Sequence, residues 1–187
     1  KRVVKQGLLD MKKIVEHLEN GDIDYDEVRI TFIEGKNMRS IAKTIAENTN
    51  NTEQDVFNLL EDEEYIDSLI EKYWFLTDEI KQDDIYYPLE GYLLPDTYAF
   101  ENEDVSVENI FNVLLNHMDK FLTEYKYEMP NNLTVHQTLT MASMAELEGK
   151  SLEDRQEIVG VFFNRVYNGM NLGSDVTTYY AFKVDMG

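Results

Sequence analysis

The spacing of apolar residues predicts a chain in which helices outnumber strands. Apolar positions recur every three or four residues over 8–18, 37–50, 53–76 and 105–125, which is the spacing of a helix that buries one face. The 53–76 segment is long enough for one or two such helices. Over 28–32 apolar and polar residues alternate instead, and this pattern predicts a strand. The chain is therefore expected to adopt an α+β fold.

A segment rich in aromatic residues separates the two helical halves. It runs over 86–100 and reads YYPLEGYLLPDTYAF. Gly91 and Pro95 interrupt any helix within it. Because its large apolar side chains need burial, we expect a structured loop or a short hairpin rather than a flexible linker.

Two further helices are predicted over 134–148 and 151–168, packed as a hairpin. Each begins with a hydroxyl residue, and a Gln or Asp three residues later completes a capping box. Each is followed by a glycine, which favours a helix end. Gly160 lies inside the second helix, where glycine costs roughly 1 kcal/mol relative to alanine. A close approach of the two helices would account for it.

Composition and charge exclude several classes of function. The 187 residues include 17 Lys and Arg against 37 Asp and Glu, and the net charge of −20 opposes binding to nucleic acid or to an anionic bilayer. With no cysteine, the chain has neither disulfides nor a thiolate nucleophile. No apolar run approaches the roughly 20 residues that span a bilayer. His17, His117 and His136 are too far apart in sequence to suggest a metal site.

Two carboxylates remain as candidates for chemistry, Glu146 and Glu148, in the last turn of the helix predicted over 134–148. Both continue rows that are apolar elsewhere, so periodicity does not choose between them. The small alanines beside Glu146 leave more room for a ligand than the methionines beside Glu148. A carboxyl in apolar surroundings near the negative end of a helix dipole keeps its proton more readily, which suits a general acid for glycosidic cleavage. The alternative is a helix-end carboxylate that reaches solvent or pairs with Arg155 or Arg165.

Several stretches, in this order along the chain, resemble a known family. They are ITFIEGKNMRSIA, LEGYLLPDTYAF, TMASMAELEGKSLEDRQEIVGVFFNRVYNGMNLGSD and TTYYAF. Together they are similar to the MltG, or YceG-like, family of endolytic murein transglycosylases. The resemblance implies an α+β fold with a small LysM-like unit followed by a mostly helical, lysozyme-like catalytic region.

The resemblance also implies roles for particular residues. The family pattern places its catalytic acid/base at Glu146, with Ser143 and Glu148 as matching neighbours and Leu147 in place of the usual lysine. Asn164, Arg165, Asp175 and Thr177 match further family positions and are expected to support the site or bind substrate. Val176 stands where the family pattern has proline, so the loop there is expected to differ in shape from the family's.

The aromatic segment is expected to border a glycan groove. Tyr92 and Tyr98 offer flat faces for sugar stacking, and Asp96 and Glu90 could bind sugar hydroxyls. The alternative is that the two tyrosines simply fill the core between two domains.

We expect three divisions of the chain. Residues 1–25 would end a preceding LysM-like segment, 26–100 would hold the LysM-like unit with connecting helices and the loop, and 101–187 would form part of the catalytic region. We expect the family's membrane anchor and its C-terminal segment to lie outside the given sequence. The chain therefore looks like a piece of a single-pass anchored protein on the extracytoplasmic face of a bacterial membrane, and this piece alone is expected to be inactive if the missing segment completes the groove.

The activity implied is cleavage of the MurNAc–GlcNAc β-1,4 bond of nascent peptidoglycan with formation of 1,6-anhydroMurNAc. The resemblance implies that a single glutamate serves as general acid and base, and that the reaction uses no cofactor and no metal. Glycan strands are the expected substrate, and cell-wall synthases are conceivable partners. The alternative function is a non-catalytic peptidoglycan-binding module with a LysM-like unit. Aminodeoxychorismate lyase, a name that similar sequences have carried, is a weaker alternative.

Overall fold

A two-stranded antiparallel sheet joins segments far apart in the sequence. The computed structural model describes residues 27–129 and 133–182, so the helix predicted over 8–18 lies outside the described residues. Strand β1 (Val28–Thr31) pairs with β2 (Thr97–Phe100), with Val28 opposite Phe100. The predicted strand is confirmed. The aromatic segment, however, supplies the partner strand of β1 and is not a hairpin within itself.

Three helices and a short 3-10 helix follow β1. They are α2 (Met38–Asn48), α3 (Glu53–Leu60), α4 (Glu63–Lys72) and η1 (Asp78–Lys81). The segment predicted as one or two helices divides after Leu60, because Asp62 accepts a hydrogen bond from the backbone N–H of Tyr65 at 3.1 Å and caps a new helix.

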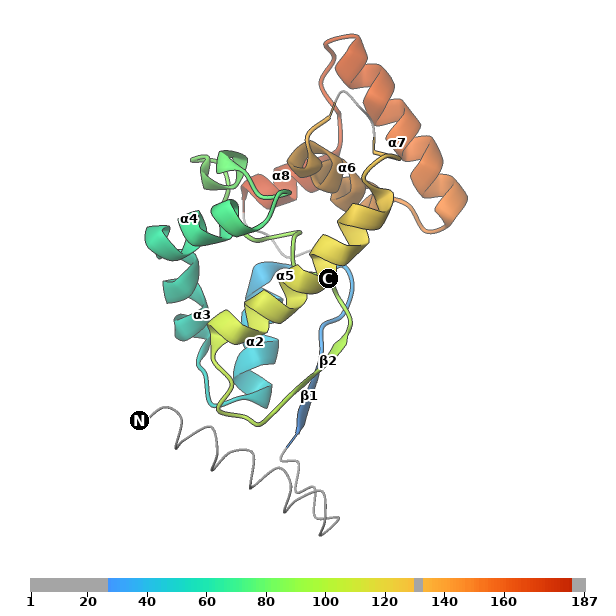
Figure 1. Ribbon diagram of the computed structural model, residues 1–187. Coiled ribbons are helices and arrows are strands. Elements are labelled where there is room, and N and C mark those ends of the chain that lie inside the picture. Colours follow the sequence, from blue (N-terminus) through green and yellow to red (C-terminus); the bar gives the residue numbers. More distant parts are fainter. Residues whose placement is uncertain (1–26, 130–132, 183–187) are drawn as a thin grey trace, which may run out of the picture.

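A large hydrophobic cluster holds these elements together with α5 (Val107–Tyr125). Ile30 and Phe100 from the two strands, Ile45 from α2 and Phe111 from α5 are all buried within it. Figure 1 shows α5 running past the sheet and the three helices that follow β1. α5, the first helix after residue 100, therefore belongs to the same hydrophobic core as the two strands.

The remaining helices gather at one end of the molecule (Figure 1). They are α6 (Val135–Glu148), α7 (Leu152–Tyr167) and α8 (Asp175–Ala181). α6 packs against both α7 and α8, so the predicted hairpin is confirmed. A second, smaller cluster forms between them around Met141, Met144, Phe162 and Val176.

The expected reason for Gly160 is wrong. Gly160 is exposed, and a Cβ atom added there would meet no atom within 4 Å. The two helices therefore do not need a glycine at this position. Their close contact is instead at Gly149, between the helices, where an added Cβ would lie 2.9 Å from the backbone nitrogen of Arg155.

The fold is α+β and mostly helical, as the sequence predicts. Because α5 shares the large cluster with the sheet, the core continues across residue 100. The division of the chain into domains remains a prediction. Across residues 27–129 and 133–182, the longest helices are too polar or too short to cross a bilayer.

Candidate active site

The N-terminal end of α6 is fastened to the large cluster. Thr134 caps the helix in the predicted capping box, and its hydroxyl donates to a carboxylate oxygen of Glu79 at 3.1 Å. Two residues further on, Nδ1 of His136 lies 2.9 Å from the hydroxyl oxygen of Tyr92. Val135 and Leu139 pack against the same cluster. The first turn of α6 is thus held against the large cluster.

The two glutamates at the other end of α6 have different surroundings. Glu146 is half-buried, and its carboxyl carbon lies 4.0 Å from the position of a Cβ atom added to Gly35, in the loop after β1. Glu148 is exposed and accepts a hydrogen bond from the hydroxyl of Ser174, which is itself buried. Glu146 therefore faces the α/β part of the molecule, whereas Glu148 holds the loop that precedes α8.

The two arginines considered as partners of these glutamates bind backbone carbonyls. Nε of Arg155 donates to the carbonyl of Gly149 at 3.1 Å. Arg165 donates to the carbonyl of Leu172. Arg155 thus closes the turn between α6 and α7, and Arg165 holds the loop after α7. Of the alternatives for a helix-end carboxylate, Glu148 reaches solvent, and its hydrogen-bond partner is Ser174.

The other residues that the resemblance placed at the site are spread around α6 and α8. Ser143 is exposed, and its hydroxyl donates to the carbonyl of Thr140 at 2.8 Å. Asp175 is the exposed first residue of α8, and the hydroxyl of Thr177 donates to the carbonyl of Ser174 at 2.7 Å. The bond from Ser174 to Glu148 brings this stretch to the acidic end of α6.

Asn164 lies further along α7. It is exposed and borders a hollow of about 260 Å³ with Phe163, Val166 and Tyr167. Val176, which stands where the family has proline, is buried in the small cluster. Valine fits this position because it fills apolar space between α6 and α8.

The prediction that Tyr92 and Tyr98 offer their faces to a sugar is wrong for the described structure. Tyr92 is 1% exposed and Tyr98 is 4% exposed. The ring of Tyr92 stacks on Phe75. The ring of Tyr98 lies against Phe32, and its hydroxyl donates to the carbonyl of Leu94 at 2.7 Å. The alternative expectation, that these aromatic residues fill the core, describes them better.

Burial changes the acidity of both tyrosines. It raises the pKa of Tyr98 to about 12, with a smaller contribution from the charge of Asp96. It also raises the pKa of Tyr92, and the charge of Glu79 adds to this effect. Asp96 itself is exposed, and its carboxylate accepts the backbone N–H of Thr97 at 2.7 Å. Its contact therefore supports the start of β2.

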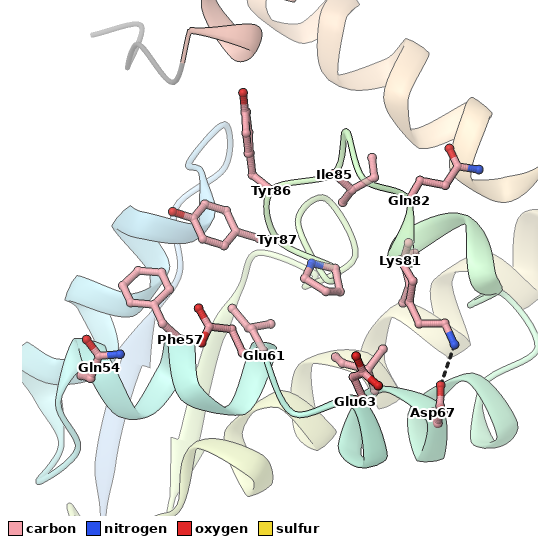
Figure 2. Close-up of a pocket in the computed structure, with 14 residues that line it drawn as sticks. Gln54, Phe57, Glu61, Glu63, Asp67, Lys81, Gln82, Ile85, Tyr86 and Tyr87 are labelled. Carbon is pink, nitrogen blue, oxygen red and sulfur yellow. Dashed lines mark hydrogen bonds and ion pairs between the residues drawn. The ribbon is translucent and has the colours of Figure 1, made fainter.

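An open cleft of about 590 Å³ lies elsewhere, between α3, α4, η1 and the segment 82–88 (Figure 2). Aromatic rings of Phe57, Tyr86 and Tyr87 line it together with carboxylates that include Glu61. Nζ of Lys81 lies 2.7 Å from Asp67 and 2.8 Å from Asp78. None of the residues that line this cleft belongs to α6, α7 or α8, so the cleft is separate from Glu146.

Two residues at the site were not predicted from the sequence. Gly35 lies in the stretch EGK of the first matching motif, but its position near Glu146 brings together residues more than a hundred positions apart. Ser174 stands just before Asp175, as a helix N-cap would, yet its hydroxyl binds Glu148 instead of capping α8. Within the described ranges, no three His, Asp or Glu residues come together as a metal site would require.

Comparison with known proteins decides the family. The model of the YceG-like family matches residues 4–186. The chain belongs to this family. The match takes in both the sheet and α6 to α8, so Glu146, Gly35 and Ser174 all lie within the part of the sequence that the family shares.

Curated relatives carry a name that describes an activity. The chain is 36% identical over 175 residues to an endolytic murein transglycosylase of Bacillus subtilis (strain 168), covering 92% of this chain and 48% of the relative. It is 32% identical over 188 residues to an endolytic murein transglycosylase of Streptococcus pneumoniae serotype 2 (strain D39), covering 94% of this chain and 34% of the relative. The chain thus spans less than half the length of these relatives.

A solved structure shows the same fold. A crystal structure of a YceG-like protein from Listeria monocytogenes is similar with a TM-score of 0.79 and 31% sequence identity. The similarity covers 94% of this chain and 58% of the Listeria chain. The arrangement of the sheet and the helices is therefore that of the YceG-like family.

Proposed function

We propose that this chain is part of an endolytic lytic transglycosylase of peptidoglycan and that Glu146 is its general acid and base. The observation that carries the proposal is the difference between the two glutamates. Glu148 is engaged by Ser174 in holding the loop before α8. Glu146 is half-buried at the junction of the two parts of the molecule and faces the loop after β1. The names of the curated relatives support the reaction class.

The proposed chemistry requires a single carboxyl group. The protonated Glu146 gives its proton to the glycosidic oxygen between N-acetylmuramic acid and N-acetylglucosamine, and the C–O bond breaks through an oxocarbenium-like transition state. The resulting carboxylate then takes the proton of the C6 hydroxyl of N-acetylmuramic acid, while the C6 oxygen bonds to the anomeric carbon of the same sugar. A 1,6-anhydro ring closes and the glutamate is again protonated. Because no water attacks, no second carboxylate is needed to activate one.

The partners and location follow from this reaction. Peptidoglycan glycan strands are the substrate, which places the active protein on the extracytoplasmic side of a bacterial membrane. Synthesis enzymes of the wall are the partners expected for an enzyme that cuts nascent strands. A net charge of −20 is compatible with a substrate whose sugar backbone offers hydroxyl and amide groups.

The test compares two substitutions in the full natural chain. Glu146→Gln keeps the shape of the side chain but removes the transferable proton, and general acid–base catalysis is typically worth about 10²- to 10⁴-fold. We expect a loss of anhydro-muropeptide release at the upper end of this range, since one group serves both proton transfers. Glu148→Gln is the matched control, and we expect a much smaller loss.

Melting temperature and product analysis complete the experiment. Both variants should melt close to the wild type, because a neutral amide replaces an acid of equal size. If Glu148→Gln abolished anhydro-muropeptide release and Glu146→Gln retained it, the assignment of the glutamates would be reversed. If both retained it, the acid would lie elsewhere, with Asp175 the next candidate. A wild-type protein that binds glycan and releases no anhydro ends would instead support the binding-module alternative.

A further inference from the structure

The loop between β1 and α2 brings its backbone to the acidic end of α6. Gly35, at its tip, has a φ of +69°, and a Cβ atom added there would lie 4.0 Å from the carboxyl carbon of Glu146. A left-handed backbone conformation favours glycine. Gly169 has a similar φ of +64°, but nothing lies within 4 Å of a Cβ atom added to it. The approach to a carboxyl group therefore distinguishes Gly35 from a glycine that simply makes a turn.

The loop is fastened on both sides of its tip. Before it, the backbone N–H of Phe32 donates to the carbonyl of Asp96 at 2.9 Å. After it, the backbone N–H of Met38 donates to a carboxylate oxygen of Glu90 at 2.8 Å. Both acceptors belong to the aromatic segment that leads into β2. The tip is thus held on the sheet and the large cluster rather than on α6.

Charged side chains flank the tip. Glu34 and Lys36 are the immediate neighbours of Gly35, and both are exposed. On the side of α6, the carboxylate of Glu148 is occupied by Ser174. Glu146 thus lies between the tip of the loop and the end of its own helix, with the exposed Glu34 and Lys36 beside the tip.

We propose that the loop 33–36 forms a wall of the active site and that Gly35 is a positioning residue for Glu146. This inference rests on the proposed function. A Cβ atom at position 35 would meet the carboxyl carbon of Glu146 at 4.0 Å, an ordinary van der Waals distance, so a side chain extending beyond Cβ would intrude on the orientation in which the Glu146 proton reaches the glycosidic oxygen. The α/β part of the molecule would then contribute directly to the site, in addition to supporting α6. Displacing a catalytic group by about 1 Å can cost on the order of 10²-fold in rate.

The first test fills the space in front of the carboxyl group. Asparagine tolerates the left-handed conformation better than other residues with side chains, so Gly35→Asn adds bulk at Glu146 with little backbone strain. Gly169→Asn is the matched control, since it lies beyond the far end of α7, a 16-residue helix about 24 Å long. In the full natural chain we expect Gly35→Asn to lower the kcat for anhydro-muropeptide release by about 10²-fold, with a smaller change in KM, and Gly169→Asn to leave it unchanged.

A second pair of variants adds a charge in place of a neutral amide. Gly35→Asp puts a carboxylate beside Glu146, and a like charge favours the protonated form of a neighbouring acid. The alkaline limb of the rate profile, where the general acid loses its proton, should therefore move to higher pH in Gly35→Asp relative to Gly35→Asn. Gly169→Asp should leave the profile where it is. A purely structural role for the loop would lower activity without moving the profile.

The outcomes separate this inference from the proposed function. A normal kcat in Gly35→Asn together with an unmoved pH profile in Gly35→Asp would overturn the wall, while the loss in Glu146→Gln would still stand. If Gly35→Asn did not fold, as judged from its melting temperature, the smaller Gly35→Ser would replace it. That variant adds a hydroxyl beyond the Cβ position, which lies 4.0 Å from the carboxyl carbon of Glu146, and full activity in a folded Gly35→Ser would equally overturn the wall.

Discussion

The two hydrophobic clusters of the molecule differ greatly in size. Among the described residues, the large cluster contains 26 buried side chains and the small one contains four. In α5, seven residues are buried, whereas α7 buries only Phe162 and leaves apolar side chains such as Val161 and Val166 about half exposed. Glu146, the candidate acid, therefore lies near the small cluster, on a helix whose first turn packs against the large cluster.

This difference explains how a half-buried carboxyl group is tolerated. The large cluster provides most of the apolar burial, which is the main favourable contribution to folding. α6 connects the two clusters, through Val135 and Leu139 at one end and Met141 and Met144 at the other. The large cluster thus stabilises the helix that bears the site, and the small cluster holds α6, α7 and α8 together.

The largest expected effect comes from opening a cavity in each cluster. Phe111 is fully buried in the large cluster, and Phe111→Ala should destabilise the protein by about 3–5 kcal/mol. Phe162→Ala removes the same atoms from the small cluster, where neighbouring helices can relax more easily. We expect it to cost less in urea denaturation and to speed amide hydrogen exchange mainly in α6 and α7. Equal losses and equally global exchange would show that the two clusters unfold as one unit.

Local sequence signals predicted the helices that surround the site. Thr134 with Gln137, and Ser151 with Asp154, both form the capping boxes expected of them. The choice between Glu146 and Glu148 could not be made from periodicity, because both continue apolar rows. It depends on what the next segments of the chain place opposite them, namely the tip of the loop after β1 and Ser174.

Long-range pairing accounts for what the sequence did not reveal. Residues 97–100 follow a glycine and a proline and look like a loop, yet they pair with a strand about 70 positions earlier. This pairing draws Tyr98 into the core and so removes its face from solvent. The aromatic residues suggested sugar stacking because their number was visible in the sequence, whereas their burial was not.

A smaller effect is expected at alkaline pH, and it tests the large cluster. Burial raises the pKa of Tyr98 from 10.0 to about 12. The unfolded chain therefore loses this proton at lower pH than the folded protein does. The stability due to the protonated tyrosine is fully present below pH 10 and is lost as pH rises towards 12.

Urea denaturation between pH 9 and pH 12 would measure this loss. The denaturation midpoint of the wild type should fall more steeply with pH than that of Tyr98→Phe, even though the variant starts lower through its missing bond to Leu94. The raised pKa values of Tyr65 and Tyr92, also in this part of the molecule, add to the fall in both proteins. Identical slopes for the two proteins would show that Tyr98 titrates alike in the folded and unfolded states.

The smallest expected effect is a stabilising one, at Gly160 in α7, the helix that contributes Phe162 to the small cluster. Gly160 lies in the interior of α7 with no atom within 4 Å of an added Cβ, so Gly160→Ala meets no obstacle. Alanine in a helix interior is favoured over glycine by roughly 0.5–1 kcal/mol, partly because it restricts the unfolded chain. We expect a rise in the free energy of unfolding of this size, with unchanged glycan cleavage. Gly149→Ala is the control within the same hairpin: its added carbon would lie 2.9 Å from the backbone nitrogen of Arg155, so it should destabilise. If Gly160→Ala also destabilised the protein, the exposed face of α7 would be covered in solution, and the contrast between the two clusters would be smaller than the described residues indicate.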